Sequence, residues 1–68
     1  MGYLLNNELA IKIREKYKNS YFANKLGISS TYVSLILHRK QKAPKRIAYA
    51  FTKAIDVNAE LEDYFSVK

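Results

Sequence analysis

The 68-residue chain contains no cysteine and no tryptophan, and it has only one proline and two glycines. Without cysteine it can form neither a disulfide framework nor a thiolate metal site, and a reducing cytoplasm is the expected compartment. No apolar run approaches the roughly 18 residues that a membrane-spanning helix needs, and the start MGYLLNNELA lacks the layout of a signal peptide. The sequence therefore predicts one small soluble domain over residues 1–68, with no membrane partner.

Acidic residues are scarce in most of the chain. From Lys12 to Lys53 there are eleven Lys or Arg residues and a single acid, Glu15, whereas four of the six acids lie between Asp56 and Asp63. The formal net charge is +6. A basic body of this kind attracts polyanions, of which nucleic acid is the commonest in a cell. A solvated basic surface that only maintains solubility is the alternative.

Hydrophobic periodicity predicts five helices, and no segment alternates like a β-strand. The predicted fold is therefore an all-α, compact five-helix bundle. Each helix has a residue that suits its start or its end. In chain order these are Asn6 or Asn7, Asn19 or Ser20, Gly27, Ser29 or Ser30, Pro44, and Asn58. The apolar faces assign Phe22, Leu26, Val33, Ile36, Ile47 and Phe51 to the core.

The second and third predicted helices are joined by a tight turn around Gly27. Glycine suits the left-handed backbone that ends a helix, and Val33 and Ile36 lie where the third helix must pack back on the second. Two short helices joined in this way form a helix-turn-helix unit, whose second helix can enter the major groove of DNA. The small side chains of Ser30 and Thr31 would keep the start of that helix slim enough to approach base edges. An ordinary helical hairpin in a small bundle is the alternative.

The segment from Asn19 to Val57 resembles the helix-turn-helix domain of phage Cro- and CI-type repressors, the Xre family. The resemblance lies in FANKLGISSTYVSLI, in the basic loop that ends at Pro44, and in FTKAIDV. It implies a lambda-repressor-like fold and a transcriptional regulator that binds palindromic operators, usually as a dimer. The sequence departs from the family at Arg39, where a glycine usually ends the recognition helix. The third helix is therefore expected to run on or to close differently.

The resemblance also implies which residues contact DNA. Ser30, Thr31 and Leu35 match the principal base-reading positions, and Ser34 on the same helix completes that set. Leu35 cannot donate a hydrogen bond, so it would favour contact with a thymine methyl group.

A second set of residues is expected to contact the sugar-phosphate backbone. Asn19 and His38 match phosphate-contacting positions of the family. Charge and position add Lys25, Tyr32, Arg39, Lys40, Lys42, Lys45 and Arg46. A solvated face is the alternative for the charges, and a partly packed surface position is the alternative for Tyr32. The basic residues from Lys12 to Lys18 are expected to contribute only a long-range electrostatic attraction for DNA.

The C-terminal segment carries many apolar side chains for the end of a small domain. A two-fold dimer would bury Leu61, Tyr64 and Phe65 and would supply a second recognition helix. Alternatively, these residues roof the bundle of their own chain.

No metal, cofactor or small-molecule ligand is expected. His38 is the single histidine, and one imidazole without cysteine or a nearby acid cannot build a metal site. The chain also lacks a pair of carboxylates, a nucleophile with its base and a phosphate-gripping loop, so it is not expected to be an enzyme.

The leading hypothesis is a sequence-specific regulator that binds double-stranded DNA, resembling a Cro-like repressor of a phage or another mobile element. The alternatives are a DNA-binding antitoxin, an excisionase-type accessory factor and a helical protein-interaction module.

Overall fold

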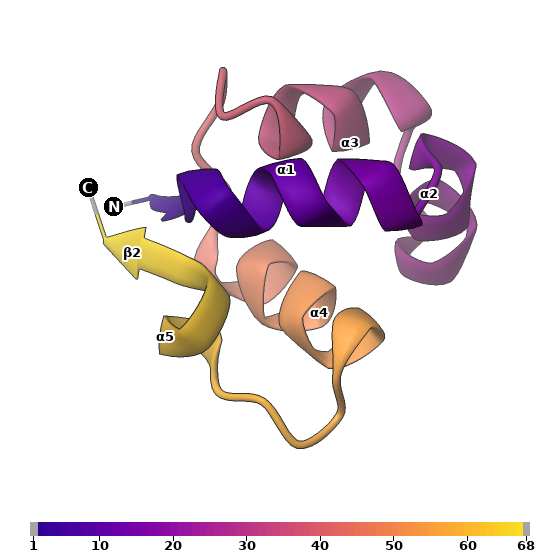
Figure 1. Cartoon of the computed structure of the whole chain (residues 1–68). Helices are drawn as coiled ribbons and strands as arrows, with labels where there is room; N and C mark the ends of the chain where they lie inside the picture. The colour runs from indigo at the N-terminus through magenta and orange to yellow at the C-terminus, as the bar shows by residue number, and fades with distance from the viewer. Residues whose placement is uncertain (1, 68) are drawn as a thin grey trace.

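The two ends of the chain lie side by side in a short antiparallel sheet. Strand β1 (Tyr3–Leu5) pairs with strand β2 (Phe65–Val67), with Tyr3 opposite Val67. On its other side, Tyr3 exchanges two backbone hydrogen bonds of 2.8 Å with Ala43. The sheet thereby ties both termini and the segment before α4 together at one end of the molecule (Figure 1).

Five helices lie between these strands in the computed structural model, which describes residues 2–67. They are α1 (Asn7–Lys16), α2 (Asn19–Leu26), α3 (Ser30–Leu37), α4 (Lys45–Ile55) and α5 (Leu61–Tyr64). In Figure 1, α1 crosses the molecule between α3 on one side and α4 and α5 on the other, and α2 lies at its far end. The predicted five helices are confirmed. None of the helices in residues 2–67 has the length and apolar character needed to cross a membrane.

The structure adds a two-stranded sheet that the predicted all-α bundle does not contain. Each strand has only three residues, which is too short for an alternating pattern to stand out in the sequence. Strand formation depends instead on pairing between the two ends of the chain, and no local signal encodes that pairing.

Two helix starts follow the predicted chemistry. Oδ1 of Asn6 accepts hydrogen bonds from the backbone N–H groups of Glu8 at 3.0 Å and Leu9 at 3.3 Å. Oγ of Ser29 accepts from the N–H of Tyr32 at 3.1 Å. Asn6 and Ser29 therefore satisfy N–H groups that a helix start leaves free.

Two other predicted caps are wrong. Asn19 is the first residue of α2 and Lys18 is its N-cap, with no hydrogen bond from a side chain. Asn58 does not cap α5, because its backbone N–H donates to Oδ1 of Asp56 at 3.0 Å within the preceding turn. Glu60 is the N-cap of α5 instead, and its N–H donates to Oδ2 of Asp63 at 2.9 Å.

The core is built around two phenylalanine rings. The ring centres of Phe22 and Phe51 are 4.7 Å apart, and both side chains are fully buried. Val33 and Ile36 are buried on the inner face of α3, as the sequence predicts, whereas Leu26 and Ile47 are half-buried at the margin. One buried hydroxyl, that of Thr52, donates to the carbonyl oxygen of Ala48 at 3.0 Å. This bond offsets the cost of placing a polar group in the core.

The C-terminal apolar residues belong mainly to the same core. Leu61 and Phe65 are 6% and 2% exposed, and the Phe65 ring packs against Phe51 with 6.3 Å between ring centres. Tyr64 is half-buried. The apolar surface of Leu61 and Phe65 is already covered within the chain, which leaves these two side chains little area for a dimer contact. Their burial against Phe51 fits the alternative, in which they cover the bundle of their own chain.

Candidate nucleic-acid interface

Helices α2 and α3 meet across a glycine turn. Gly27 adopts the left-handed conformation with φ 70° and ψ 35°, and its N–H donates to the carbonyl oxygen of Ala23 at 2.9 Å. Only three residues separate the last residue of α2 from the first of α3, so the two helices must cross steeply. Their shared side is apolar, because Phe22 and Val33 are fully buried. The outer side of α3 is thereby left to its polar residues.

The end of α3 is closed by Arg39 in a glycine-like conformation. Its φ is 59°, and it is the only non-glycine residue with a positive φ in residues 2–67. The N–H of Arg39 donates to Ile36, and the N–H of Lys40 donates to Leu35, at 3.1 and 2.9 Å. These two bonds form a Schellman motif, the arrangement in which glycine usually occupies the left-handed position. The third helix therefore does not run on: it ends at Leu37 and is closed by Arg39, a residue other than glycine.

Two arginines bind carbonyl oxygens at this end of α3. Nη1 of Arg14 donates to the carbonyl oxygen of Leu37 at 2.7 Å, and Nε of Arg39 donates to that of Leu5 at 2.8 Å. Arg14 thus satisfies a carbonyl group in the last turn, where a positive charge also suits the helix dipole. Arg39 was predicted to contact the DNA backbone. Although it is exposed, its Nε is engaged in holding β1 to the loop.

Two surface hollows meet at His38 along the outer side of α3. The first lies between α1, α2 and the start of α3, and is lined by Arg14, Tyr17, Lys18, Asn19, Ser20, Ser30 and His38. The second follows the C-terminal half of α3 and is lined by Ser34, Leu35, His38 and Lys40. We call the two hollows together the α3 face. Its lining contains several cations and no carboxylate, so the surface attracts anions along its whole length.

Three of the four predicted base-reading residues line the α3 face, and the fourth, Thr31, is exposed at the start of α3. Ser30 and Thr31 are exposed at the start of α3, while Ser34 and Leu35 are half-buried one turn further on. Ser30, Ser34 and Leu35 line the hollows directly. The structure thus leaves the hydroxyl groups at the tip of α3 accessible to solvent.

The predicted backbone-contacting residues fall into two groups. Asn19, His38 and Lys40 line the α3 face. The others lie outside the two hollows. Of these, Lys25, Lys42, Lys45 and Arg46 are exposed, and Tyr32 is half-buried against the core. The alternative for Tyr32, a partly packed surface position, fits its burial.

Two cations of this face were missed by the sequence reasoning. Arg14 and Lys18 were expected to contribute only a long-range field, but both line the hollow at the start of α2 and α3. Lys18 lies immediately before the expected start of the second helix. A cation at a helix start is a sequence signal that could have placed Lys18 in the candidate site.

The helices differ in the charge and the capping of their first turns. The first turns of α1 and α5 carry acids and side-chain caps, whereas α2 and α4 have no side-chain cap and no acid in the first turn. In α4, Lys45 and Arg46 occupy the first turn, where positive charge opposes the helix dipole. Each such charge costs roughly 0.3–1 kcal/mol unless an anion is bound nearby. An anion bound at either start would offset the missing side-chain cap.

No family model, no curated protein and no solved structure matches the chain.

Proposed function

We propose that the protein is a sequence-specific regulator that binds double-stranded DNA and reads the major groove with α3. The observation that carries this proposal is the α3 face. It combines accessible hydroxyl groups at the tip of a helix with flanking cations, and no carboxylate lines it. Base edges are read by side-chain donors and acceptors, and the surrounding cations supply affinity for phosphate.

Each part of the α3 face has a task in this proposal. The start of α2 receives a phosphate, with Lys18 and Asn19 beside its free N–H groups. Ser30 and Thr31 approach base edges, and Leu35 packs against a thymine methyl group. His38 and Lys40 contact the next phosphates along the strand. Together α2 and α3 act as a helix-turn-helix, as in the Cro-like repressors that the sequence resembles.

A dimer on a palindromic operator is part of the proposal. Because Leu61 and Phe65 are buried, the second copy must meet another surface near the C-terminus. Val57, between α4 and α5, is 72% exposed, which is high for an aliphatic side chain. We expect Val57 to contact the second copy and Val57→Asp to weaken dimer formation in sedimentation equilibrium without affecting the fold.

The decisive experiment is selection of bound fragments from random duplex DNA by the purified protein. The proposal requires enrichment of one sequence, arranged as two inverted half-sites about 34 Å apart between centres. Enrichment of a single half-site, without an inverted copy, would contradict the dimer but would still support sequence reading by α3. Fragments recovered without any common sequence would contradict sequence-specific recognition.

A further inference from the structure

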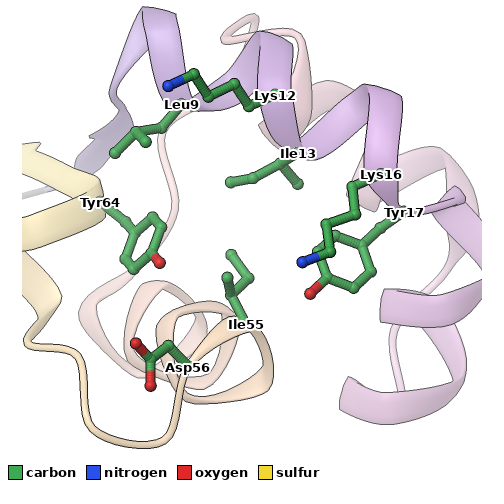
Figure 2. A pocket seen from close by; sticks show the side chains of 8 residues that line it. All are labelled: Leu9, Lys12, Ile13, Lys16, Tyr17, Ile55, Asp56 and Tyr64. Carbon is green, nitrogen blue, oxygen red and sulfur yellow. The ribbon is translucent and has the colours of Figure 1, made fainter.

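A groove of about 340 Å³ lies between α1 and the C-terminal end of α4 (Figure 2). Ile13 projects into it from α1 and Ile55 from α4, while Tyr64 and Tyr17 stand at its two ends. Its remaining lining residues are Leu9, Lys12, Lys16 and Asp56. We call it the α1–α4 groove. It has an apolar floor and a charged rim, and the DNA-binding proposal makes no use of it.

The rim of this groove carries a net positive charge. Lys12 and Lys16 are exposed and lie four residues apart, so they share one side of α1. The Lys16 ammonium lies 5.5 Å from the ring centre of Tyr17, a contact that keeps the charge at the rim. The one carboxylate, Asp56, accepts a hydrogen bond from the N–H of Asn58 and is partly engaged with its own loop. An anionic group is therefore favoured beside the two lysines.

The lysine rim of the α1–α4 groove lies on the opposite side of α1 from Arg14, while Tyr17, at the end of α1, lines both the groove and the α3 face. Successive helical residues are rotated by about 100°, so Arg14 points about 200° away from both Lys12 and Lys16. Arg14 reaches the carbonyl oxygen of Leu37 in α3. A DNA duplex that contacts α3 would therefore leave the lysine rim uncovered.

The shape of the groove favours a polypeptide over a small molecule. The stretch of α1 from Leu9 to Lys16 rises by about 10 Å, and the groove is open along it (Figure 2). Small ligands bind tightly where most of their surface becomes buried, which an open groove does not offer. A protein segment can instead insert one large side chain and contact the rim with its neighbours.

We propose that the α1–α4 groove binds an acidic segment of a partner protein. A large apolar side chain of that segment packs between Ile13 and Ile55, and carboxylates on either side of it contact Lys12 and Lys16. This interaction goes beyond DNA binding and is compatible with it, because Lys12 and Lys16 point away from Arg14 and the α3 face. The protein would thereby connect DNA to an acidic partner.

The test uses the full chain and a blocked hexapeptide, Glu-Glu-Leu-Trp-Glu-Glu, titrated into ¹⁵N-labelled protein. We expect amide shifts at Leu9, Ile13, Ile55 and Tyr64, with a dissociation constant of about 0.1–1 mM. A second peptide, in which serines replace Leu and Trp, should cause much smaller shifts because it lacks the apolar anchor. The double variant K12E/K16E should bind the first peptide at least about tenfold more weakly.

A matched variant separates this proposal from the DNA-binding proposal. K18E/K40E has the same change of charge but on the α3 face, so it should lose DNA binding and keep peptide binding. K12E/K16E should keep specific DNA binding, and its dispersed amide spectrum reports that it is folded. Failure of DNA selection alone would leave the peptide result standing.

Four results would overturn the groove proposal. One is the absence of any shift at millimolar peptide, and another is equal affinity for K12E/K16E. A third is a set of shifts centred on Ser30, Thr31 and His38, which would mean that the acidic peptide imitates DNA. The fourth is a concentration-dependent change at Ile13 and Ile55 without peptide, which would assign the groove to a second copy of the chain.

Discussion

Arg39 holds strand β1 against the end of α3, since its Nε donates to the carbonyl oxygen of Leu5 at 2.8 Å. It does so from a left-handed backbone with φ 59°. For a residue with a Cβ atom this conformation costs about 1 kcal/mol or more. The hydrogen bond to Leu5 offsets that cost and links the helix end to the sheet of the two termini.

We first predict that the two contributions of Arg39 can be separated by two substitutions. Arg39→Met removes the hydrogen bond but keeps the strained backbone, so the free energy of unfolding should fall by about 1–2 kcal/mol. Arg39→Gly removes both, and it should be about 1 kcal/mol more stable than Arg39→Met. Urea unfolding of the two variants and the wild type measures both differences. Equal stability of Arg39→Met and the wild type would show that the bond to Leu5 contributes nothing.

The position of Arg39 illustrates what the sequence could predict about the fold. The periodicity predicted five helices, and the caps at Asn6 and Ser29 were correct, because those signals act within a few residues. The closure at Arg39 depends on Leu5, which is 34 residues away. The strands likewise depend on pairing of Tyr3 with Val67. Contacts of this range leave no local pattern in a single sequence.

A second prediction concerns the turn between α2 and α3. An added Cβ at Gly27 would meet no atom within 4 Å, so Gly27→Ala tests backbone strain alone. It should lower the free energy of unfolding by about 1 kcal/mol, and Gly27→Asn should cost less, because asparagine tolerates the left-handed region. Thermal or urea unfolding ranks the two variants. An alanine variant as stable as the wild type would contradict the φ of 70° at this position.

A third prediction concerns close packing at the N-terminus. A Cβ at Gly2 would lie 2.5 Å from Cβ of Lys42, next to the backbone bonds between Tyr3 and Ala43. Gly2→Ala should therefore cost about 1–2 kcal/mol, because the strand must shift to avoid the overlap.

The double variant Gly2→Ala/Lys42→Gly provides the control for this third prediction. Lys42→Gly removes the opposing Cβ, so the two changes together should cost less than the sum of their separate effects. Strict additivity in urea unfolding would show that the two residues do not meet.

The sequence could predict those parts of the candidate site that depend on a single helix. Ser30 and Thr31 follow the glycine turn, and their exposure could be expected from the spacing of Val33 and Ile36 alone. The position of Arg14 in the lining of the α3 face could not be predicted, because it depends on how α1 lies beside α3. Crossing angles between helices are set by the packed core as a whole, and the sequence pattern of one helix does not contain them.

A fourth prediction tests the reading helix. Thr31→Glu places a carboxylate at the exposed start of α3, where it would face phosphates and base edges. Affinity for the selected operator should fall roughly a hundredfold. Stability should stay equal or rise slightly, because a negative charge suits a helix N-terminus. Fluorescence anisotropy with labelled duplex measures the affinity, and thermal unfolding measures the stability.

Ser66→Glu is the matched control for this fourth prediction, since it adds the same charge at an exposed position of β2. It should reduce affinity far less than Thr31→Glu. Equal losses in the two variants would mean that net charge alone governs binding, and unchanged operator affinity in Thr31→Glu would count against α3 as the reading helix.

A fifth prediction separates phosphate contacts from base reading. Lys18→Gln/Lys40→Gln removes one cation from each hollow of the α3 face. Binding to the operator and to unrelated duplexes should weaken by similar factors, and the slope of log K against log salt should flatten by about 0.9 for each lost contact. The control Lys12→Gln/Lys16→Gln removes the same charge from the α1–α4 groove and should leave the slope close to that of the wild type. A changed base preference in the first variant would show that Lys18 or Lys40 contacts bases and not phosphates. A control slope that flattens equally would show that only the total charge is being measured, and not the geometry of the α3 face.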